Sequence, residues 1–310
     1  MQHLIPNNLF ERTEWEALVA STAKVTNVSS VPQLSPFRYP GGKTWFVPTA
    51  RKWLASLDTS STLVEPFCGG GIIGLTAAFE SWVDKVLMAE KDPCVAAVWH
   101  TILGNDYQWL SDQIGSIDIT PDSIQQLGKA ESRSTRDLAL STIVRNRTSH
   151  GGILAKGSGM IKNGDGKGLK SRWYPQTIQR RIKNIHQHSD RICFRQYDAL
   201  QLLEELKNDG RCAFFIDPPY TAAGKRLYTF HDINHEQLFE LVAQLKGHFL
   251  MTYDLCDKVR WLADCFRMEW TTIPMQTTHL VEKREIIISD NLAWFIEKSP
   301  TYKPREVAIC

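Results

Sequence analysis

Four consecutive residues near residue 217 combine groups that could do chemistry on a planar amine. Asp217, Pro218, Pro219 and Tyr220 follow the apolar run 212–216. The Asp217 carboxylate and the Pro218 carbonyl can accept hydrogen bonds from an exocyclic amine, which stabilises the positive charge that develops when its nitrogen attacks. Tyr220 can stack on a base, an interaction typically worth ~1–3 kcal/mol. The alternative is a strand terminator with an incidental acid, because proline ends strands.

A glycine-rich turn lies about 150 residues earlier in the chain. Gly69, Gly71 and Gly74 fit the pattern GxGxxG between an expected strand and helix, and Glu90 follows at the end of the next expected strand. Such glycines let the backbone approach a nucleoside cofactor, and the acid accepts hydrogen bonds from ribose hydroxyls. NAD is the usual ligand of this pattern. However, Glu65 precedes the glycines and would repel a pyrophosphate, so the sequence favours the cationic S-adenosylmethionine (SAM).

Basic residues gather in the segment from Arg133 to Lys183. It holds 12 Lys and Arg residues against two acids, a balance of +10, whereas the whole chain carries +2. This asymmetry indicates a surface that binds a polyanion; a solvated surface stretch is the alternative.

The composition is that of an ordinary globular protein, with 43% hydrophobic and 23% charged residues. No stretch approaches the roughly 20 apolar residues that span a bilayer, and no signal peptide is expected. The seven cysteines are scattered without a CxxC pair, so we expect no bound metal and a cytoplasmic location.

The elements expected around these motifs alternate between strands and helices. The sequence predicts strands at 61–67, 86–90, 191–197, 212–216, 248–253 and 284–289, with helices at 72–82, 92–103, 199–206 and about 234–246. This alternation predicts a parallel sheet covered by helices. Residues 106–148 look mostly helical, and the glycine- and lysine-rich stretch 150–170 looks like a loop. A basic insert therefore separates two α/β stretches.

Taken together, these segments resemble the DNA adenine methylase (Dam) family of SAM-dependent N6-adenine methyltransferases. The resemblance covers roughly residues 35–290 and rests on YPGGK (39–43), LVEPFCGGG (63–71), MAEKD (88–92), RNRTSHGG (145–152), QYDA (196–199), IDPPYT (216–221) and KREIIIS (283–289). The family usually has Asp where this chain has Glu90, which should preserve ribose binding. RNRTSHGG matches only in part, so base specificity is not carried over.

The resemblance implies a role for each matching position. Asp217, Pro218 and Tyr220 would act on the target adenine. The SAM site would be formed by Tyr39, Lys43, Glu65, Phe67, Gly69, Gly71, Glu90, Asp198 and Asp217, with Glu90 on the ribose and Asp198 on the adenine of the cofactor. DNA would be bound by Arg145, Asn146, Arg147, Lys156, Lys162, Lys167, Lys170 and Arg172.

The implied fold is a Rossmann-like class I methyltransferase sheet with an inserted, mainly helical target-recognition lobe. We expect an N-terminal extension at 1–33, a SAM-binding catalytic domain at 34–105 and 190–310, and the DNA-binding lobe at 106–189. The expected partner is double-stranded DNA, with a cognate restriction endonuclease as a further candidate, no membrane, and a monomer in solution. The alternatives are an RNA or other amine methyltransferase, a catalytically idle DNA-binding homologue, and an NAD-dependent oxidoreductase.

Overall fold

The computed structural model describes residues 30–38, 42–57, 62–129, 134–155, 157–162, 166–219, 232–276 and 282–296. Its strands are β1 (Thr62–Glu65), β2 (Lys85–Glu90), β3 (Ile192–Gln196), β4 (Cys212–Ile216), β5 (Phe249–Asp254), β6 (Glu269–Gln276) and β7 (Glu282–Ser289). Its α-helices are α2 (Val47–Ser56), α3 (Ile72–Phe79), α4 (Pro93–Leu103), α5 (Tyr107–Ser116), α6 (Pro121–Lys129), α7 (Thr135–Thr148), α8 (Pro175–His186), α9 (Ala199–Leu206), α11 (His235–Val242), α12 (Asp257–Cys265) and α13 (Ala293–Ile296). Short 3-10 helices are η2 (Lys43–Phe46), η3 (His150–Gly152) and η5 (Gly168–Arg172).

The strands form one seven-stranded sheet in the order β3-β2-β1-β4-β5-β7-β6. The first five strands in this order pair in parallel, and β7 is antiparallel to both β5 and β6. The expected α/β fold with a parallel sheet is therefore confirmed. Strand order reverses between β1 and β4, because the chain leaves β1 toward β2 and β3 and later returns to β4. Ligands of open α/β sheets bind at such a switch point, beyond the carboxyl ends of the strands.

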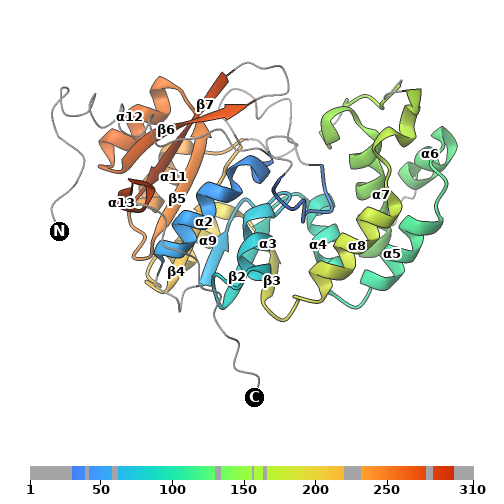
Figure 1. Cartoon of the computed structure of the whole chain (residues 1–310), viewed down its shortest axis with the longest axis horizontal. Helices are drawn as coiled ribbons and strands as arrows, with labels where there is room; N and C mark the ends of the chain where they lie inside the picture. Colours follow the sequence, from blue (N-terminus) through green and yellow to red (C-terminus); the bar gives the residue numbers. More distant parts are fainter. Residues whose placement is uncertain are drawn as a thin grey trace.

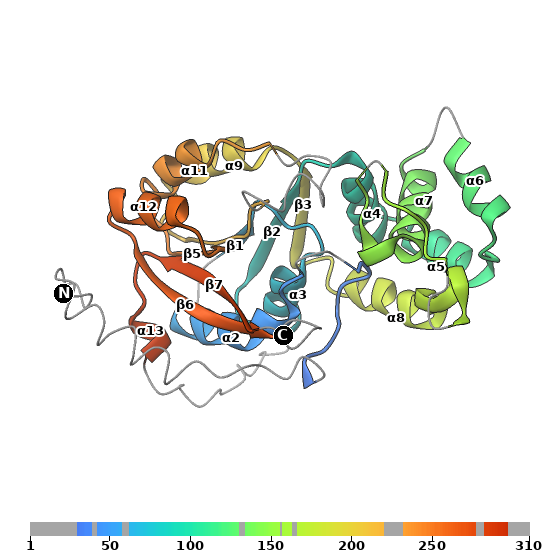
Figure 2. The same cartoon turned by 90° about the horizontal axis from the view of Figure 1, so that it is seen from above.

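Helices cover both faces of the sheet. Figure 2 shows α9, α11 and α12 on one face, with α2, α3 and α13 on the other. The alternation of side chains along β4 explains why both faces are apolar: Phe214 packs in the core under α9 and α11, whereas Phe215 packs in the core under α2 and α3. A strand buried on both faces reads as an unbroken apolar run.

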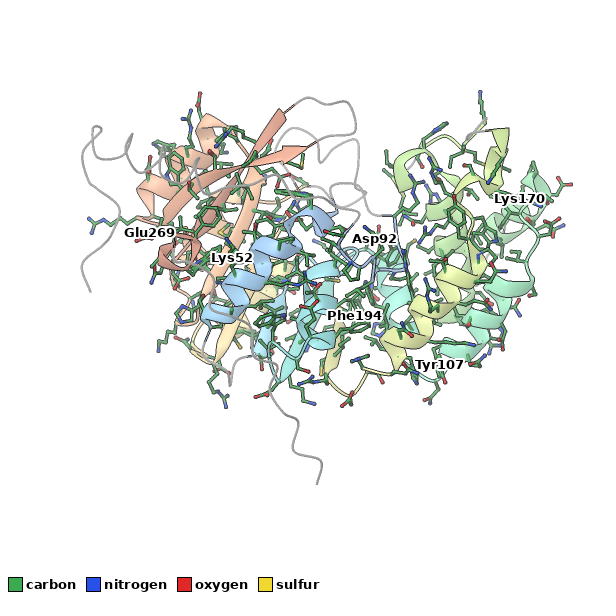
Figure 3. All side chains as sticks on the ribbon, viewed as in Figure 1. Lys52, Asp92, Tyr107, Lys170, Phe194 and Glu269 are labelled. Atoms are coloured by element: carbon green, nitrogen blue, oxygen red, sulfur yellow. The ribbon has the colours of Figure 1, made fainter. Side chains whose placement is uncertain are left out.

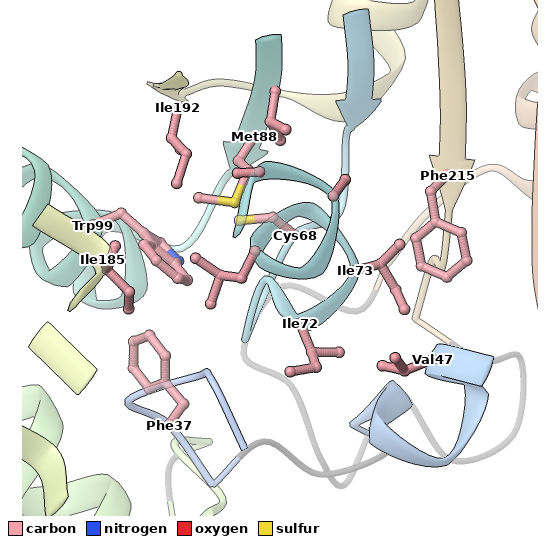
Figure 4. Packing of buried hydrophobic residues seen from close by; sticks show 14 of the residues in the cluster. Phe37, Val47, Cys68, Ile72, Ile73, Met88, Trp99, Ile185, Ile192 and Phe215 are labelled. Atoms are coloured by element: carbon pink, nitrogen blue, oxygen red, sulfur yellow. The ribbon is translucent and has the colours of Figure 1, made fainter. Parts of the chain in front are cut away.

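The insert between α4 and β3 forms the helical end of the molecule. Figures 1 and 2 show α5, α6, α7 and α8 grouped beside α4, away from β6 and β7. The apolar core continues into this group: Figure 4 shows Phe37, Trp99 and Ile185 pointing toward one another, and the rings of Phe37 and Trp99 lie 6.0 Å apart. These contacts join the residue 30–38 segment, α4 and α8. None of the helices in the described ranges is long and apolar enough to cross a membrane.

Candidate active site

The carboxylate of Asp217 is held at the carboxyl end of β4, next to the switch point. Thr252 on β5 donates a hydrogen bond of 2.7 Å from its Oγ1 to Asp217 Oδ1. Lys43 on η2 places its Nζ 2.9 Å from the same oxygen. The Asp217 side chain is 21% exposed and lines a cavity. Two donors therefore fix one carboxylate oxygen from inside the protein.

The ammonium of Lys43 is buried between two carboxylates. Its side chain is 3% exposed, and Nζ also lies 3.4 Å from Oε2 of Glu285 on the antiparallel strand β7. Burial alone would lower the pKa of Lys43, but Asp217 and Glu285 outweigh burial and raise this pKa. The lysine therefore stays charged and keeps a permanent cation behind the Asp217 carboxylate.

The turn after β1 brings backbone close to the space in front of Asp217. Gly69 and Gly71 have φ of +45° and +63°, a left-handed conformation that favours glycine. A Cβ atom on Gly71 would lie 2.9 Å from Cζ2 of Trp99, so this position also requires glycine for space. The Trp99 indole on α4 donates a 3.0 Å hydrogen bond to the Gly69 carbonyl oxygen. Trp99 thus fixes the turn through both a hydrogen bond and close packing.

Glu65, the last residue of β1, is a buried carboxyl group at the start of α3. It accepts a 2.9 Å hydrogen bond from the backbone N–H of Gly74, and only 3% of the residue is exposed. Burial, with a further contribution from the charge of Asp217, raises the pKa of Glu65 to about 8. Glu65 also lines the cavity, so a cation bound there would favour its ionised form.

Glu90 ends β2 and holds two backbone amides. Its carboxylate accepts hydrogen bonds from Gly69 N at 3.1 Å and from Asp92 N at 2.9 Å. Burial raises the pKa of Glu90 to about 7, although these amides oppose the shift. Asp198 follows β3 and caps α9 through Leu200 N at 2.9 Å. The Asp198 carboxylate also binds Lys91 at 2.9 Å.

A single cavity of about 1200 Å³ connects these groups. The sheet supplies its wall with Glu65, Phe67, Gly69, Glu90, Asp198 and Asp217, and Lys43 and Pro219 also line it. The glycine cradle and the acids at the carboxyl ends of four neighbouring strands fit SAM, because they offer close backbone approach, ribose acceptors and carboxyl groups for a cation. Among the described residues, no group of three or more His, Cys, Asp or Glu side chains could hold a metal ion.

The residues expected to bind DNA fall into two groups. Arg145, Lys162, Lys167 and Lys170 are exposed, and Figure 3 shows Lys170 on the helical end of the molecule. Lys170 forms a 2.7 Å ion pair with Asp118. Arg172 is partly buried and lines the cavity.

Asn146 and Arg147, by contrast, are buried. The Asn146 amide side chain donates to the carbonyls of Arg38 and Gly152 and accepts from Arg38 N. This arrangement gives Asn146 a structural role that the sequence did not indicate. Pro218 is also buried, whereas its neighbour Pro219 lines the cavity. Tyr39, Lys156 and Tyr220 lie outside the described residues, so their expected roles stay predictions.

Three residues of the site were not predicted. Thr252 and Glu285 lie on β5 and β7, and Trp99 lies on α4. Glu285 belongs to the segment KREIIIS. An acid next to three isoleucines in a strand could have indicated a buried carboxylate with a cationic partner. Thr252 and Trp99 carry no comparable signal, because hydroxyl and indole groups occur in many strands and helices.

Solved structures of methyltransferases resemble the chain at low sequence identity. Among solved structures, the chain is similar to a SAM-dependent methyltransferase from Agrobacterium tumefaciens, with 8% identity and a TM-score of 0.39 over 80% of this chain and 62% of that chain. It is also similar to the rRNA methyltransferase aviRa from Streptomyces viridochromogenes, with 11% identity and a TM-score of 0.37 over 92% and 96% of the two chains. No curated protein matches the chain.

The family comparison covers most of the sequence. The model of the D12 class N6 adenine-specific DNA methyltransferases matches residues 39–276, a range that includes the glycine turn, the helical insert and the Asp217 segment. The chain therefore belongs to the D12 class of N6 adenine-specific DNA methyltransferases, and its methyl donor is SAM.

Proposed function

We propose that the protein transfers a methyl group from SAM to the N6 amine of adenine in double-stranded DNA. The observation that carries this proposal is the Asp217 carboxylate, held by Lys43 and Thr252 in the same cavity as the glycine turn. Among the described residues, the protein binds Oδ1 of this carboxylate, and we propose that Oδ2 accepts an N–H from a substrate amine.

Methyl transfer places positive charge on the amine nitrogen until a proton leaves. When bound, SAM supplies the electrophilic methyl group. Asp217, together with the Pro218 carbonyl, accepts hydrogen bonds from the amine and stabilises the positive charge. Lys43 holds the Asp217 carboxylate in position through an ion pair of 2.9 Å. Glu90 and Asp198 would hold the ribose and adenine of the cofactor, and Tyr39, Phe67 and Glu65 would complete its site.

Adenine in a duplex must leave the base stack before it can reach this cavity. Flipping costs a few kcal/mol, and stacking on Tyr220 would offset part of that cost. In this proposal, residues 34–105 and 190–310 form the catalytic domain, and residues 106–189 form the lobe that holds the DNA. The enzyme would act as a cytoplasmic monomer, and light scattering tests the oligomeric state.

The direct test is incubation with radiolabelled SAM and mixed-sequence duplex DNA, followed by digestion to nucleosides. We expect label in N6-methyladenine; label absent from adenine would refute the proposal. Asp217→Ala should abolish transfer while DNA affinity stays within about twofold, since the substitution removes an acceptor. Asp257→Ala, which removes an exposed acid on α12, is the matched control and should methylate like wild type.

Two alternatives have distinct outcomes. An RNA or other amine methyltransferase on this fold would prefer RNA over duplex DNA in a competition assay that follows the same label. A catalytically idle DNA-binding homologue would bind duplex DNA but show no heat of SAM binding in calorimetry. The Asp217 carboxylate is held by the Lys43 ammonium, which also pairs with Glu285. This arrangement favours a working enzyme over a catalytically idle homologue.

A further inference from the structure

The cavity is also lined by cationic groups that the proposed chemistry does not use. Four arginines line it: Arg38, Arg147, Arg172 and Arg181. They come from the segment before η2, from α7, from η5 and from α8, so three separate parts of the helical insert and the residue 30–38 segment meet here. Convergence of guanidinium groups from distant segments requires a reason, because like charges repel.

Two of these guanidinium groups carry buried donors that lack a partner. Arg38 Nη1 and Arg147 Nε are inaccessible to solvent and form no hydrogen bond within the described part of the chain. Arg147 is only 5% exposed. A buried donor left unsatisfied costs about 1–3 kcal/mol, more when it is charged. Unsatisfied donors at this density are unusual in native structures, and a bound ligand is one standard explanation.

Neighbouring arginines act on these guanidinium groups, and only the weaker contribution of Tyr174 to Arg38 has the opposite sign. The pKa of Arg147 is lowered to about 9, mainly by burial and further by the charges of Arg181 and Arg38. Burial, then Arg172, lower the pKa of Arg38. In the described ranges, neither these two arginines nor Arg181 form an ion pair with a carboxylate. A bound anion would relieve this repulsion, and a neutral base would not.

The arginines are fixed in place before any ligand binds. Arg147 donates to the Pro36 carbonyl, and Arg181 donates to the Ser35 carbonyl at 2.9 Å. Asn146 grips the backbone of Arg38 through both its N–H, at 2.8 Å, and its carbonyl, at 3.0 Å. Donors held this way lose little conformational freedom when they bind.

Gly152 permits the close packing behind this arrangement. Its φ is +78°, and a Cβ atom there would lie 2.0 Å from the Arg38 carbonyl oxygen. The buried Phe37 ring anchors the same segment against Trp99, as Figure 4 shows. The 35–38 segment is therefore fixed by hydrogen bonds, by packing and by a close approach that requires glycine.

We propose that Arg38, Arg147 and Arg181 bind one phosphodiester group of the DNA substrate, in the same cavity that receives the target adenine. This inference rests on the proposed function. The two non-bridging oxygens of a phosphodiester match the forked donors of a guanidinium group. A nucleotide whose base enters the cavity toward Asp217 carries its own phosphates with it, which makes a neighbouring phosphate the natural anion for these donors.

The test compares two neighbouring residues of α8. Arg181→Gln removes a cavity arginine, and Arg180→Gln removes an exposed one. Duplex affinity is measured by fluorescence anisotropy over a range of salt concentrations. We expect Arg181→Gln to reduce the magnitude of the slope of log K against log salt by about 1 relative to Arg180→Gln, and Arg181→Lys to restore much of it. Equal slopes for Arg180→Gln and Arg181→Gln would overturn the proposal.

A chemical scan then identifies the phosphate. In an unmethylated duplex, single phosphates around the adenine that the enzyme methylates are replaced by neutral methylphosphonates. The affinity of wild type and of each variant for each duplex is then measured. At one phosphate position, we expect the methylphosphonate to weaken duplex binding by wild type and by Arg180→Gln. The same replacement should not weaken duplex binding by Arg181→Gln, which already lacks the arginine. Losses in Arg181→Gln that match wild type at every position would contradict the assignment.

Two controls separate the possible failures. Calorimetry with SAM tests whether Arg181→Gln is folded. We expect the SAM affinity of this variant to equal that of wild type. If wild type labels no adenine, the proposed function fails, yet the salt slopes with mixed-sequence duplex still measure the arginine site. If wild type labels adenine and the slopes agree, the arginine site alone fails.

Discussion

Replacing Glu65 by Gln should change the pH dependence of stability in a predictable direction. In the folded chain the pKa of Glu65 is about 8, against an ordinary value of 4.5. Between these values the unfolded chain loses this proton and the folded chain keeps it, so the free energy of unfolding falls as pH rises. The contribution is fully present below about pH 4.5, and it is lost progressively until about pH 8.

The magnitude follows from the size of this shift. Each pKa unit corresponds to about 1.4 kcal/mol, so the full loss is about 5 kcal/mol, of which about 2 kcal/mol falls between pH 6 and pH 8. Urea unfolding of SAM-free protein at these two pH values measures the change. The side chain in Glu65→Gln cannot ionise. We therefore expect the free energy of unfolding of this variant, relative to that of wild type, to rise by about 2 kcal/mol from pH 6 to pH 8.

The control is an exposed acid on a surface helix. Glu240→Gln on α11 should differ from wild type by the same amount at both pH values. If Glu65→Gln also differs from wild type by a constant amount, Glu65 ionises in the folded protein as it does in water. The idea that its buried site holds the proton would then be refuted.

Three further predictions concern the same cavity. Lys43→Met leaves the carboxylates of Asp217 and Glu285 without their cation, and urea unfolding at pH 7 should show a loss of about 3–5 kcal/mol. Gly74→Ala places a Cβ atom 2.6 Å from Glu65 Oε2, so calorimetry should show weaker SAM binding while anisotropy shows unchanged DNA affinity. SAM binding at pH 7 should release a proton, because the cation lowers the raised pKa of Glu65; calorimetry in buffers of different ionisation enthalpy detects it, and equal heats would contradict it.

Local sequence patterns predicted much of the fold. The strand at 212–216 and the helix at 199–206 match β4 and α9 residue for residue, because an unbroken apolar run and an Asp-capped amphipathic run are strong local signals. Strand β6 was not predicted. Its sequence contains Pro274 and polar residues, and it lies at the edge of the sheet, where it pairs with β7 alone and tolerates proline.

The site was predictable where it depends on one turn and not where strands converge. The contacts of Gly69 with Glu90 follow from a motif of known geometry. The approach of Thr252 and Glu285 to Asp217 and Lys43 depends on the order of strands in the sheet, which no local pattern encodes. Asn146 illustrates the same limit on a helix: its neighbour Arg145 is exposed, whereas Asn146 is buried and bonded to the backbone of Arg38, which lies 108 residues away in the sequence.

The bridge from Asp217 through Lys43 to Glu285 has a consequence for how the protein is made. Lys43 emerges from a ribosome before Glu285, which belongs to β7, a strand that must insert between β5 and β6. Until then, the buried ammonium has only one of its two carboxylates. A nascent or truncated chain that ends before residue 282 therefore lacks one of the two carboxylates that hold Lys43 behind Asp217.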